Sequence, residues 1–196
     1  MNLPNQLTVS RFALTAVFLV AMFVAFPGHQ TAALLLFSAA GLTDYLDGRI
    51  ARERRLITDF GTLMDPLADK ILTCSAFIAF VGRDLMPAWM VVLIVARELA
   101  ITGLRLLAAH KRVVLAAERF GKHKTISQIV AIIAVLLVAA VPTWGRFGDF
   151  LLGIPIAGSS WLGWTAKISQ WVAVVLTAFS GLVYLWRNRR LYLDDL

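Results

Sequence analysis

Long apolar runs constrain this chain more than any other feature. A helix needs about 20 mostly apolar residues to cross a bilayer, and windows of this kind lie near residues 7–26, 31–49, 66–81, 87–108, 124–142 and 164–186. Hydrophobic residues make up 59% of the 196 residues, whereas soluble domains carry about 45–50%. The sequence therefore predicts an all-α, polytopic membrane protein. We expect about six transmembrane helices in one domain, residues 1–196, embedded in a lipid bilayer.

Two segments need a separate interpretation: the first apolar run and the stretch between the last two windows. We interpret the first apolar run as a retained span, because the preceding Asn2–Thr8 is not a basic signal-peptide region and no small-x-small cleavage site follows. The segment from Gly145 to Gly163 is rich in glycine yet apolar. It predicts a loop that lies along the membrane interface.

Basic residues alternate between the connections. They gather at Arg49–Arg55, at Lys111–Lys124 and at Arg187–Arg190, whereas the alternate connections hold only Arg83 and Arg146. Because basic loops stay cytoplasmic, we expect both termini and the aspartate-rich connection to face the cytosol. The net charge is +7, and the basic residues lie between the apolar runs. This placement favours anionic headgroups or phosphate substrates as partners and argues against nucleic acid.

Four aspartates flank the connection between the second and third windows. Asp44 and Asp47 are three residues apart and Asp65 and Asp69 four apart, so each pair shares one helix face. A carboxylate inside a membrane helix costs about 2.5–3.5 kcal/mol, and four together also repel one another. A divalent cation removes both costs, and carboxylate oxygens are ligands that Mg²⁺ or Mn²⁺ prefers. The pattern therefore predicts a site for Mg²⁺ or Mn²⁺.

Two glycines and an arginine fit a phosphate ligand at this site. Gly48 follows Asp47 directly and Gly61 lies one turn before Asp65, so both expose backbone where a phosphate group can approach. Arg52 adds a fixed cation suited to a diphosphate. The glycines could instead serve helix packing, and the aspartates could be interfacial partners of nearby basic residues. Four aspartates at these spacings favour the metal site.

The stretch from Asp44 to Asp69 resembles the signature of the CDP-alcohol phosphotransferases: D-x-x-D-G-x-x-A-R, eight residues, then G-x-x-x-D-x-x-x-D. Every fixed position is present. The resemblance implies a six-helix membrane enzyme that faces the cytosol and forms a homodimer. It implies that all four aspartates ligate the metal and that Asp69 is also the catalytic base. It further implies a set of residues that contact the CDP-lipid: Asn5, Thr8, Gly48, Ala51, Arg52, Thr58 and Gly61.

A second resemblance concerns the acceptor alcohol. The segments Arg97–Arg105 and Gly121–Gln128, with the N-terminal Asn2–Thr8, resemble the branch of the family that transfers a phosphatidyl group from CDP-diacylglycerol to glycerol 3-phosphate. An acceptor with its own phosphate requires cations near the metal. The candidates are Arg97, Arg105, Lys122 and Lys124.

The placement of these cations agrees with an acceptor-phosphate site. Arg97 and Arg105 are eight residues apart, hence on roughly one helix face. Arg97 lies deep in its window and is costly there unless it meets a charge, for which Glu98 is the obvious partner. Alternatively, Arg105, Lys122 and Lys124 only enforce membrane orientation.

Other functions are compatible with parts of the pattern. Related enzymes use inositol phosphate, serine or phosphatidylglycerol as acceptor, and inositol phosphate is also anionic. An intramembrane prenyltransferase uses aspartate motifs and Mg²⁺, but usually on well-separated parts of the chain. A small cation transporter would line several spans with polar groups, whereas the first, fifth and sixth windows are nearly uniformly apolar. No targeting segment is evident beyond the first span, so we expect a bacterial inner membrane, with the active site facing the cytosol.

Overall fold

The structure is a computed structural model. It describes the backbone of residues 3–54, 59–111, 113, 119–153, 155–156 and 159–193, and the side chains of residues 9–43, 67–68, 70–111, 113, 123–153, 159–189 and 191–192. The elements follow the order α1 (Leu3–Phe23), α2 (His29–Arg54), α3 (Asp59–Gly82), α4 (Ala88–His110), α5 (Arg119–Ala140), the 3₁₀ turn η1 (Val141–Trp144), α6 (Arg146–Leu152), β1 (Pro155–Ile156), β2 (Ser159–Ser160), α7 (Trp161–Arg187) and α8 (Arg190–Leu193).

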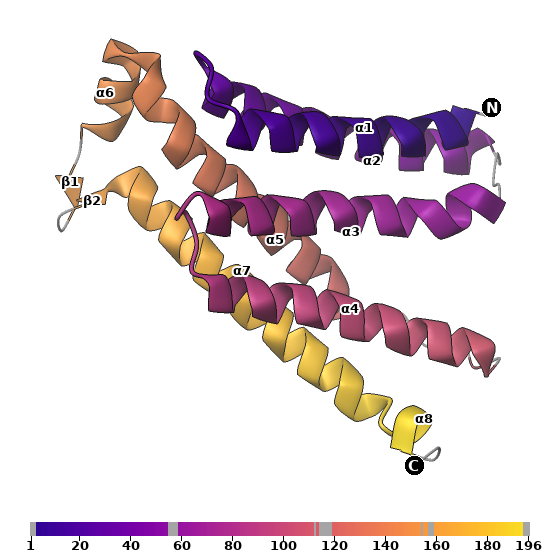
Figure 1. The fold of residues 1–196 in the computed structure, drawn as a ribbon. Coiled ribbons are helices and arrows are strands. Elements are labelled where there is room, and N and C mark those ends of the chain that lie inside the picture. Colours follow the sequence, from indigo (N-terminus) through magenta and orange to yellow (C-terminus); the bar gives the residue numbers. More distant parts are fainter. Residues whose placement is uncertain are drawn as a thin grey trace.

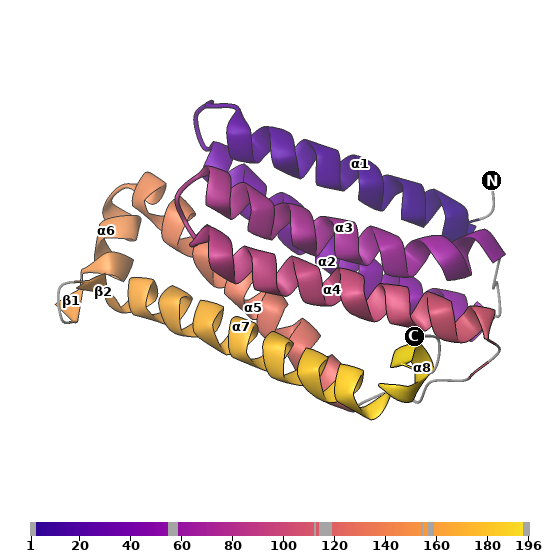
Figure 2. The ribbon, with the colours of Figure 1, turned by 60° about the horizontal axis from the view of Figure 1, so that its bottom comes forward.

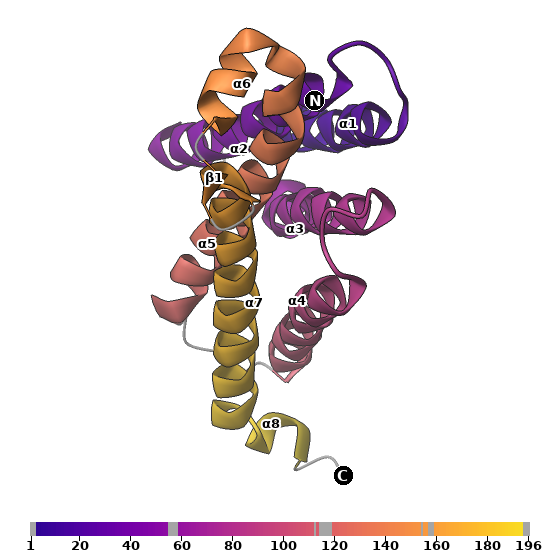
Figure 3. The same ribbon diagram turned by 90° about the vertical axis from the view of Figure 1, so that its left-hand side faces the viewer.

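The long helices form one bundle in two groups (Figure 1). Helices α1 to α4 run nearly side by side, and α1 packs against both α2 and α3. Helices α5 and α7 pack against each other and cross the first group at an angle, which is clearest in Figure 3. Helix α5 also contacts α2, and α7 contacts α4. The second group therefore closes the bundle over α2, α3 and α4.

Several helix ends meet at one end of the bundle. The N-terminus, the end of α2, the start of α3, the end of α4 and the end of α7 all lie there (Figure 2). We call this the N-terminal end. The segments with clustered basic residues adjoin this end, whereas Arg83 and Arg146 follow α3 and begin α6 at the opposite end. This arrangement agrees with the alternation of charge along the sequence.

The interior and the exterior of the bundle are both apolar. Phe18, Phe77, Phe80, Ile94 and Ile132 are fully buried between the helices. Large apolar side chains also cover the outer faces: Val17, Val20, Leu35, Ile78, Val92, Leu99, Leu106, Val130, Ile168, Val175, Phe179 and Leu182 are all exposed. An apolar exterior of this extent marks contact with lipid or with another protein.

Two helical stretches of the described chain are long and apolar enough to cross a bilayer by length and composition: His123–Trp144 and Trp161–Arg187. Val9–Phe23 and Lys70–Gly82 are shorter apolar helices. Four tryptophans lie near the starts of α4 and α7 or in η1, at the end opposite the N-terminal end: Trp89, Trp144, Trp161 and Trp164. Tryptophan is enriched at membrane–water interfaces. These features are those of an all-α membrane protein.

The long helices extend beyond the apolar windows. Helix α2 continues to Arg54 and α3 begins at Asp59, because backbone hydrogen bonding continues through charged residues that lower the hydropathy. Each aspartate pair is therefore helical, as its spacing indicated.

The prediction of a plain loop from Gly145 to Gly163 was wrong in part. The segment contains α6 and two short strands, β1 and β2, of two residues each, which pair antiparallel. Gly145 has φ +60°, a conformation that other residues rarely adopt, and it lets the chain turn into α6. Asp149 lies in the first turn of α6, where a negative charge is favourable. The Ser160 side chain accepts a hydrogen bond from the Gly163 amide at 3.1 Å and caps α7.

Candidate active site

The backbone brings both aspartate pairs to the N-terminal end of the bundle. Asp44 and Asp47 belong to the last three turns of α2, and Asp65 and Asp69 to the first three turns of α3. α2 ends and α3 begins at this same end (Figure 2). The four side chains lie outside the described residues. Among the described side chains, no group of three or more histidine, cysteine, aspartate or glutamate residues comes together.

The predicted CDP-lipid residues lie in the same region of the chain. Asn5 and Thr8 belong to the first two turns of α1, Gly48, Ala51 and Arg52 to α2, and Gly61 to α3. Their side-chain placement lies outside the described residues, as does all of Thr58. The helices nevertheless gather these positions at the N-terminal end. Their individual roles stay predictions.

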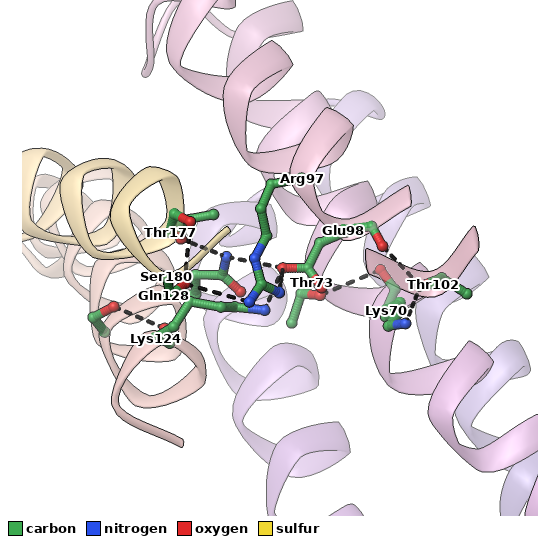
Figure 4. A network of polar contacts seen from close by, with 10 residues as sticks. Lys70, Thr73, Arg97, Glu98, Thr102, Lys124, Gln128, Thr177 and Ser180 are labelled. Atoms are coloured by element: carbon green, nitrogen blue, oxygen red, sulfur yellow. Dashed lines mark hydrogen bonds and ion pairs between the residues drawn. The ribbon is translucent and has the colours of Figure 1, made fainter. Parts of the chain in front are cut away.

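A buried carboxylate lies at the centre of the described polar residues (Figure 4). Glu98 of α4 is only 5% exposed. Its Oε1 accepts hydrogen bonds from Lys124 Nζ of α5, from Arg97 Nη1 at 3.4 Å and from Gln128 Nε2 at 3.5 Å. We call these four residues the Glu98 cluster. Two cations and one carboxylate give the cluster an excess of one positive charge.

The cluster confirms one predicted contact and adds another. The expected ion pair between Arg97 and Glu98 is present, at 3.4 Å. Lys124 is only 6% exposed and forms an ion pair with Glu98 across the α4–α5 interface. A residue that only enforced membrane orientation would not need to be buried in this way. Burying paired charges is costly, and the role of Lys124 in binding the acceptor phosphate stays a prediction.

Helix α7 completes the surroundings of the cluster. Gln128 Nε2 also donates to Thr177 Oγ1 at 3.0 Å, and Arg97 Nη2 donates to Ser180 Oγ at 3.3 Å. Thr177 and Ser180 are both buried. Arg97 Nε has no hydrogen-bond partner among the described residues. The guanidinium therefore contacts α7 through its Nη2 atom, which donates to Ser180.

A lysine connects this cluster to the aspartate helix. Lys70, the residue directly after Asp69, donates from Nζ to Thr102 Oγ1 of α4. Thr102 in turn donates to the backbone carbonyl of Glu98 at 2.7 Å. Figure 4 shows this path from α3 across to α4. Arg97 and Glu98 therefore lie on the helix that packs against α3, and Glu98 is about one turn from the Lys70 contact at Thr102.

Arg105 and Lys122 complete the predicted acceptor set. The Arg105 guanidinium carbon lies over the ring of Tyr184 in α7, 5.8 Å from the ring centre, and the residue is exposed. Arg97 and Arg105 thus both face α7, as their eight-residue separation indicated. Lys122 belongs to the first turn of α5, and its side chain lies outside the described residues.

The sequence profile of the family described as CDP-alcohol phosphatidyltransferase matches residues 1–179 of the chain. The chain belongs to this family.

Curated members of the family cover nearly the whole chain. It is 39% identical over 199 residues to the CDP-diacylglycerol–glycerol-3-phosphate 3-phosphatidyltransferase of Bacillus subtilis strain 168, with 95% of each chain covered. The protein of the same name from Rickettsia felis is 33% identical, with 93% of each chain covered. A probable phosphatidylglycerophosphate synthase of Mycobacterium tuberculosis H37Rv is 38% identical over 96% of this chain and 82% of its own. The family suggested by the Asp44–Asp69 stretch is thus confirmed.

Sequence reasoning did not assign roles to several residues around the Glu98 cluster of this family member. Gln128, Thr177 and Ser180 are polar residues within apolar windows, and Lys70 directly follows the last aspartate. Serine and threonine in helices often bond only to the preceding turn, and Ser180 Oγ does bond to the Thr177 carbonyl at 3.1 Å. The sequence alone therefore did not show whether these hydroxyl groups bond to their own helix or to a neighbouring one.

Proposed function

We propose that the chain transfers the phosphatidyl group of CDP-diacylglycerol to glycerol 3-phosphate, giving phosphatidylglycerophosphate and CMP in phospholipid biosynthesis. The names of the relatives from Bacillus, Rickettsia and Mycobacterium describe this reaction or its product, over nearly the full chain. The structure supports the same assignment through the cations that adjoin the aspartate helix.

The four aspartates are the proposed holders of Mg²⁺ or Mn²⁺. Their chemistry fits such an ion, because it is an all-oxygen donor set carried as two pairs on helices that reach the same end of the bundle. When bound, the ion neutralises the diphosphate and makes its phosphorus more electrophilic. In this proposal Gly48 and Gly61, which have no side chains, let the diphosphate approach the backbone, and Arg52 supplies a cation.

Asp69 is the proposed base. It accepts the proton from the 1-hydroxyl of glycerol 3-phosphate, and that oxygen attacks the phosphorus that carries the diacylglycerol. A new phosphorus–oxygen bond forms to glycerol, and the bond to the bridging oxygen of the diphosphate breaks. CMP leaves with that oxygen.

The observation that carries the acceptor assignment is the hydrogen bond from Lys70, next to Asp69, to Thr102 beside the Glu98 cluster. This bond joins α3, which carries the proposed base, to α4, which carries Arg97 and Arg105. Lys124 and Arg97 provide one positive charge in excess of Glu98, and Arg105 and Lys122 add two more toward the N-terminal end. This excess suits a dianionic phosphate, whereas serine has no phosphate to use it.

The surroundings of the reaction are part of the proposal. We place the protein in a bacterial inner membrane as a multi-pass homodimer, with the N-terminal end of the bundle and the active site in the cytosol. Support comes from the basic residues of that end, since positively charged segments remain cytoplasmic, and from the apolar outer faces. The acyl chains of CDP-diacylglycerol then lie in the cytoplasmic leaflet.

Purified protein is expected to release CMP from CDP-diacylglycerol only when both glycerol 3-phosphate and Mg²⁺ or Mn²⁺ are present. Chelation of the divalent ion should abolish release, since the diphosphate then lacks the charge of the ion that activates its phosphorus, and added Mn²⁺ should restore it. Coupled detection of CMP measures this directly. CMP release that persists in excess chelator would contradict the metal site, and release independent of glycerol 3-phosphate would contradict the acceptor.

A further inference from the structure

We propose that one face of α7, formed by Thr177, Ser180, Gly181 and Tyr184, positions the cations that bind the acceptor phosphate. The inference rests on the proposed function and deepens it. These four residues touch the cations or their partners, so we assign them a positioning role.

The four residues form a single stripe. They lie at positions i, i+3, i+4 and i+7, which is one face of a helix. All four are buried, with Thr177 1% and Ser180 and Tyr184 3% exposed. The opposite faces of α7 carry exposed apolar residues such as Val175, Phe179 and Leu182. The stripe is therefore the inner face of a helix whose other sides are apolar.

Gly181 makes room for the Arg97 side chain. A Cβ at this position would lie 2.6 Å from Arg97 Cγ and 3.5 Å from Arg97 Nε. A carbon–carbon approach of 2.6 Å is far inside van der Waals contact, so any side chain at this position displaces the arginine. The stem of Arg97 thus passes directly over bare backbone of α7.

The aliphatic hydroxyl groups of Thr177 and Ser180 contact the Glu98 cluster. Ser180 Oγ accepts from Arg97 Nη2 at 3.3 Å, which fixes the rotation of the guanidinium. Thr177 Oγ1 accepts from Gln128 Nε2 at 3.0 Å, and the same amide nitrogen contacts Glu98, the partner of Lys124. Thr177 therefore acts on the buried lysine through two intermediate side chains (Figure 4).

Tyr184, the fourth member of the stripe, faces Arg105, which is exposed. The Tyr184 ring lies under the Arg105 guanidinium at 5.8 Å, a geometry in which the ring face attracts the cation. Plain helix packing does not require a missing side chain, two hydroxyls and an aromatic ring, each facing a cation or its partner. The stripe instead matches a helix that sets the spacing between Arg97, Lys124 and Arg105.

The test compares two glycine-to-alanine variants. Gly181→Ala is expected to raise the KM for glycerol 3-phosphate about tenfold or more, because small misplacements of binding groups have effects of this size, with the KM for CDP-diacylglycerol within about twofold of wild type. Gly103→Ala in α4 is the matched control, since a Cβ there meets nothing within 4 Å. Gly103→Ala should keep both KM values.

A second pair covers the case in which Gly181→Ala does not fold. Thr177→Val keeps the shape of the side chain but removes the acceptor for Gln128, whereas Thr177→Ser retains the hydroxyl. We expect Thr177→Val to raise the KM for glycerol 3-phosphate several-fold and Thr177→Ser to restore it, with both variants eluting as wild type in size-exclusion chromatography.

The outcomes separate this inference from the proposed function. If wild type turns over glycerol 3-phosphate but neither Gly181→Ala nor Thr177→Val changes its KM selectively, the positioning role is wrong and the function stands. Equal loss with both substrates, accompanied by lower thermal stability, would show that α7 is only structural. If wild type uses another phosphorylated alcohol, the same comparison is made with that acceptor. If wild type uses no phosphorylated acceptor, the proposed function fails, and this inference fails with it.

Discussion

Asp69→Asn is expected to lower kcat for phosphatidyl transfer at least about a thousandfold, within the range typical of a lost acid–base group. The amide cannot accept the proton of the glycerol 3-phosphate hydroxyl at neutral pH, and it also removes one negative charge from the predicted metal site. The change conserves the size of the side chain. The variant should therefore fold and retain part of its affinity for CDP-diacylglycerol.

The measurement is CMP release together with binding of CDP-diacylglycerol to detergent-purified protein. Asp149→Asn is the matched control, because Asp149 is an exposed residue of α6 at the end opposite the predicted site. It should retain wild-type turnover. An Asp69→Asn protein that keeps more than about a tenth of the wild-type kcat would remove Asp69 as the base.

Glu98→Gln is expected to cause the largest loss of stability among the described residues. It removes the buried carboxylate that forms ion pairs with both Arg97 and Lys124. Breaking a buried ion pair in this way destabilises proteins by about 3–5 kcal/mol. We expect a marked fall in the thermal unfolding temperature in detergent, and a higher KM for glycerol 3-phosphate in whatever fraction remains folded.

A double variant separates charge balance from acceptor binding. Glu98→Gln combined with Lys124→Met removes both members of the pair, and replacing a buried pair by uncharged residues is often neutral for stability. The double variant should recover part of the unfolding temperature, because Lys124 is gone but Arg97 still lacks Glu98. It should not recover the affinity for glycerol 3-phosphate, because one phosphate-binding cation is gone. If Glu98→Gln alone unfolds at the wild-type temperature, the buried pair does not balance charge as we describe.

The helical framework followed from the sequence because apolar runs and charge alternation are local signals. Each predicted window lies largely within a long helix, and the structure adds the charged ends, such as Asp59 at the start of α3. The contact between Arg97 and Glu98 was also predictable, since neighbouring residues on a buried helix segment must compensate each other's charge. The α6 helix was not, because a short glycine-flanked segment has no clear periodicity.

The partners of the Glu98 cluster required tertiary structure. Lys124 lies 26 positions after Glu98, and Thr177 lies 49 after Gln128. No local spacing relates such residues, and only the packing of α4, α5 and α7 brings them together. Gly181 illustrates the limit further, since its role depends on a side chain 84 positions earlier that occupies the space of an absent Cβ. The metal ligands themselves stay predictions from their spacing and from the family.

Competition among acceptors tests the central claim most directly. Purified protein with CDP-diacylglycerol and Mg²⁺ or Mn²⁺ is offered glycerol 3-phosphate, inositol phosphate, serine and phosphatidylglycerol at equal concentration, and the lipid products are identified by mass spectrometry. We predict phosphatidylglycerophosphate as the dominant product, matched by an equal amount of CMP. A dominant product from inositol phosphate would contradict glycerol 3-phosphate as the acceptor, and one from serine would also contradict the role assigned to Arg97, Arg105 and Lys124. Absence of any phosphatidyl transfer by folded protein would contradict the proposed reaction.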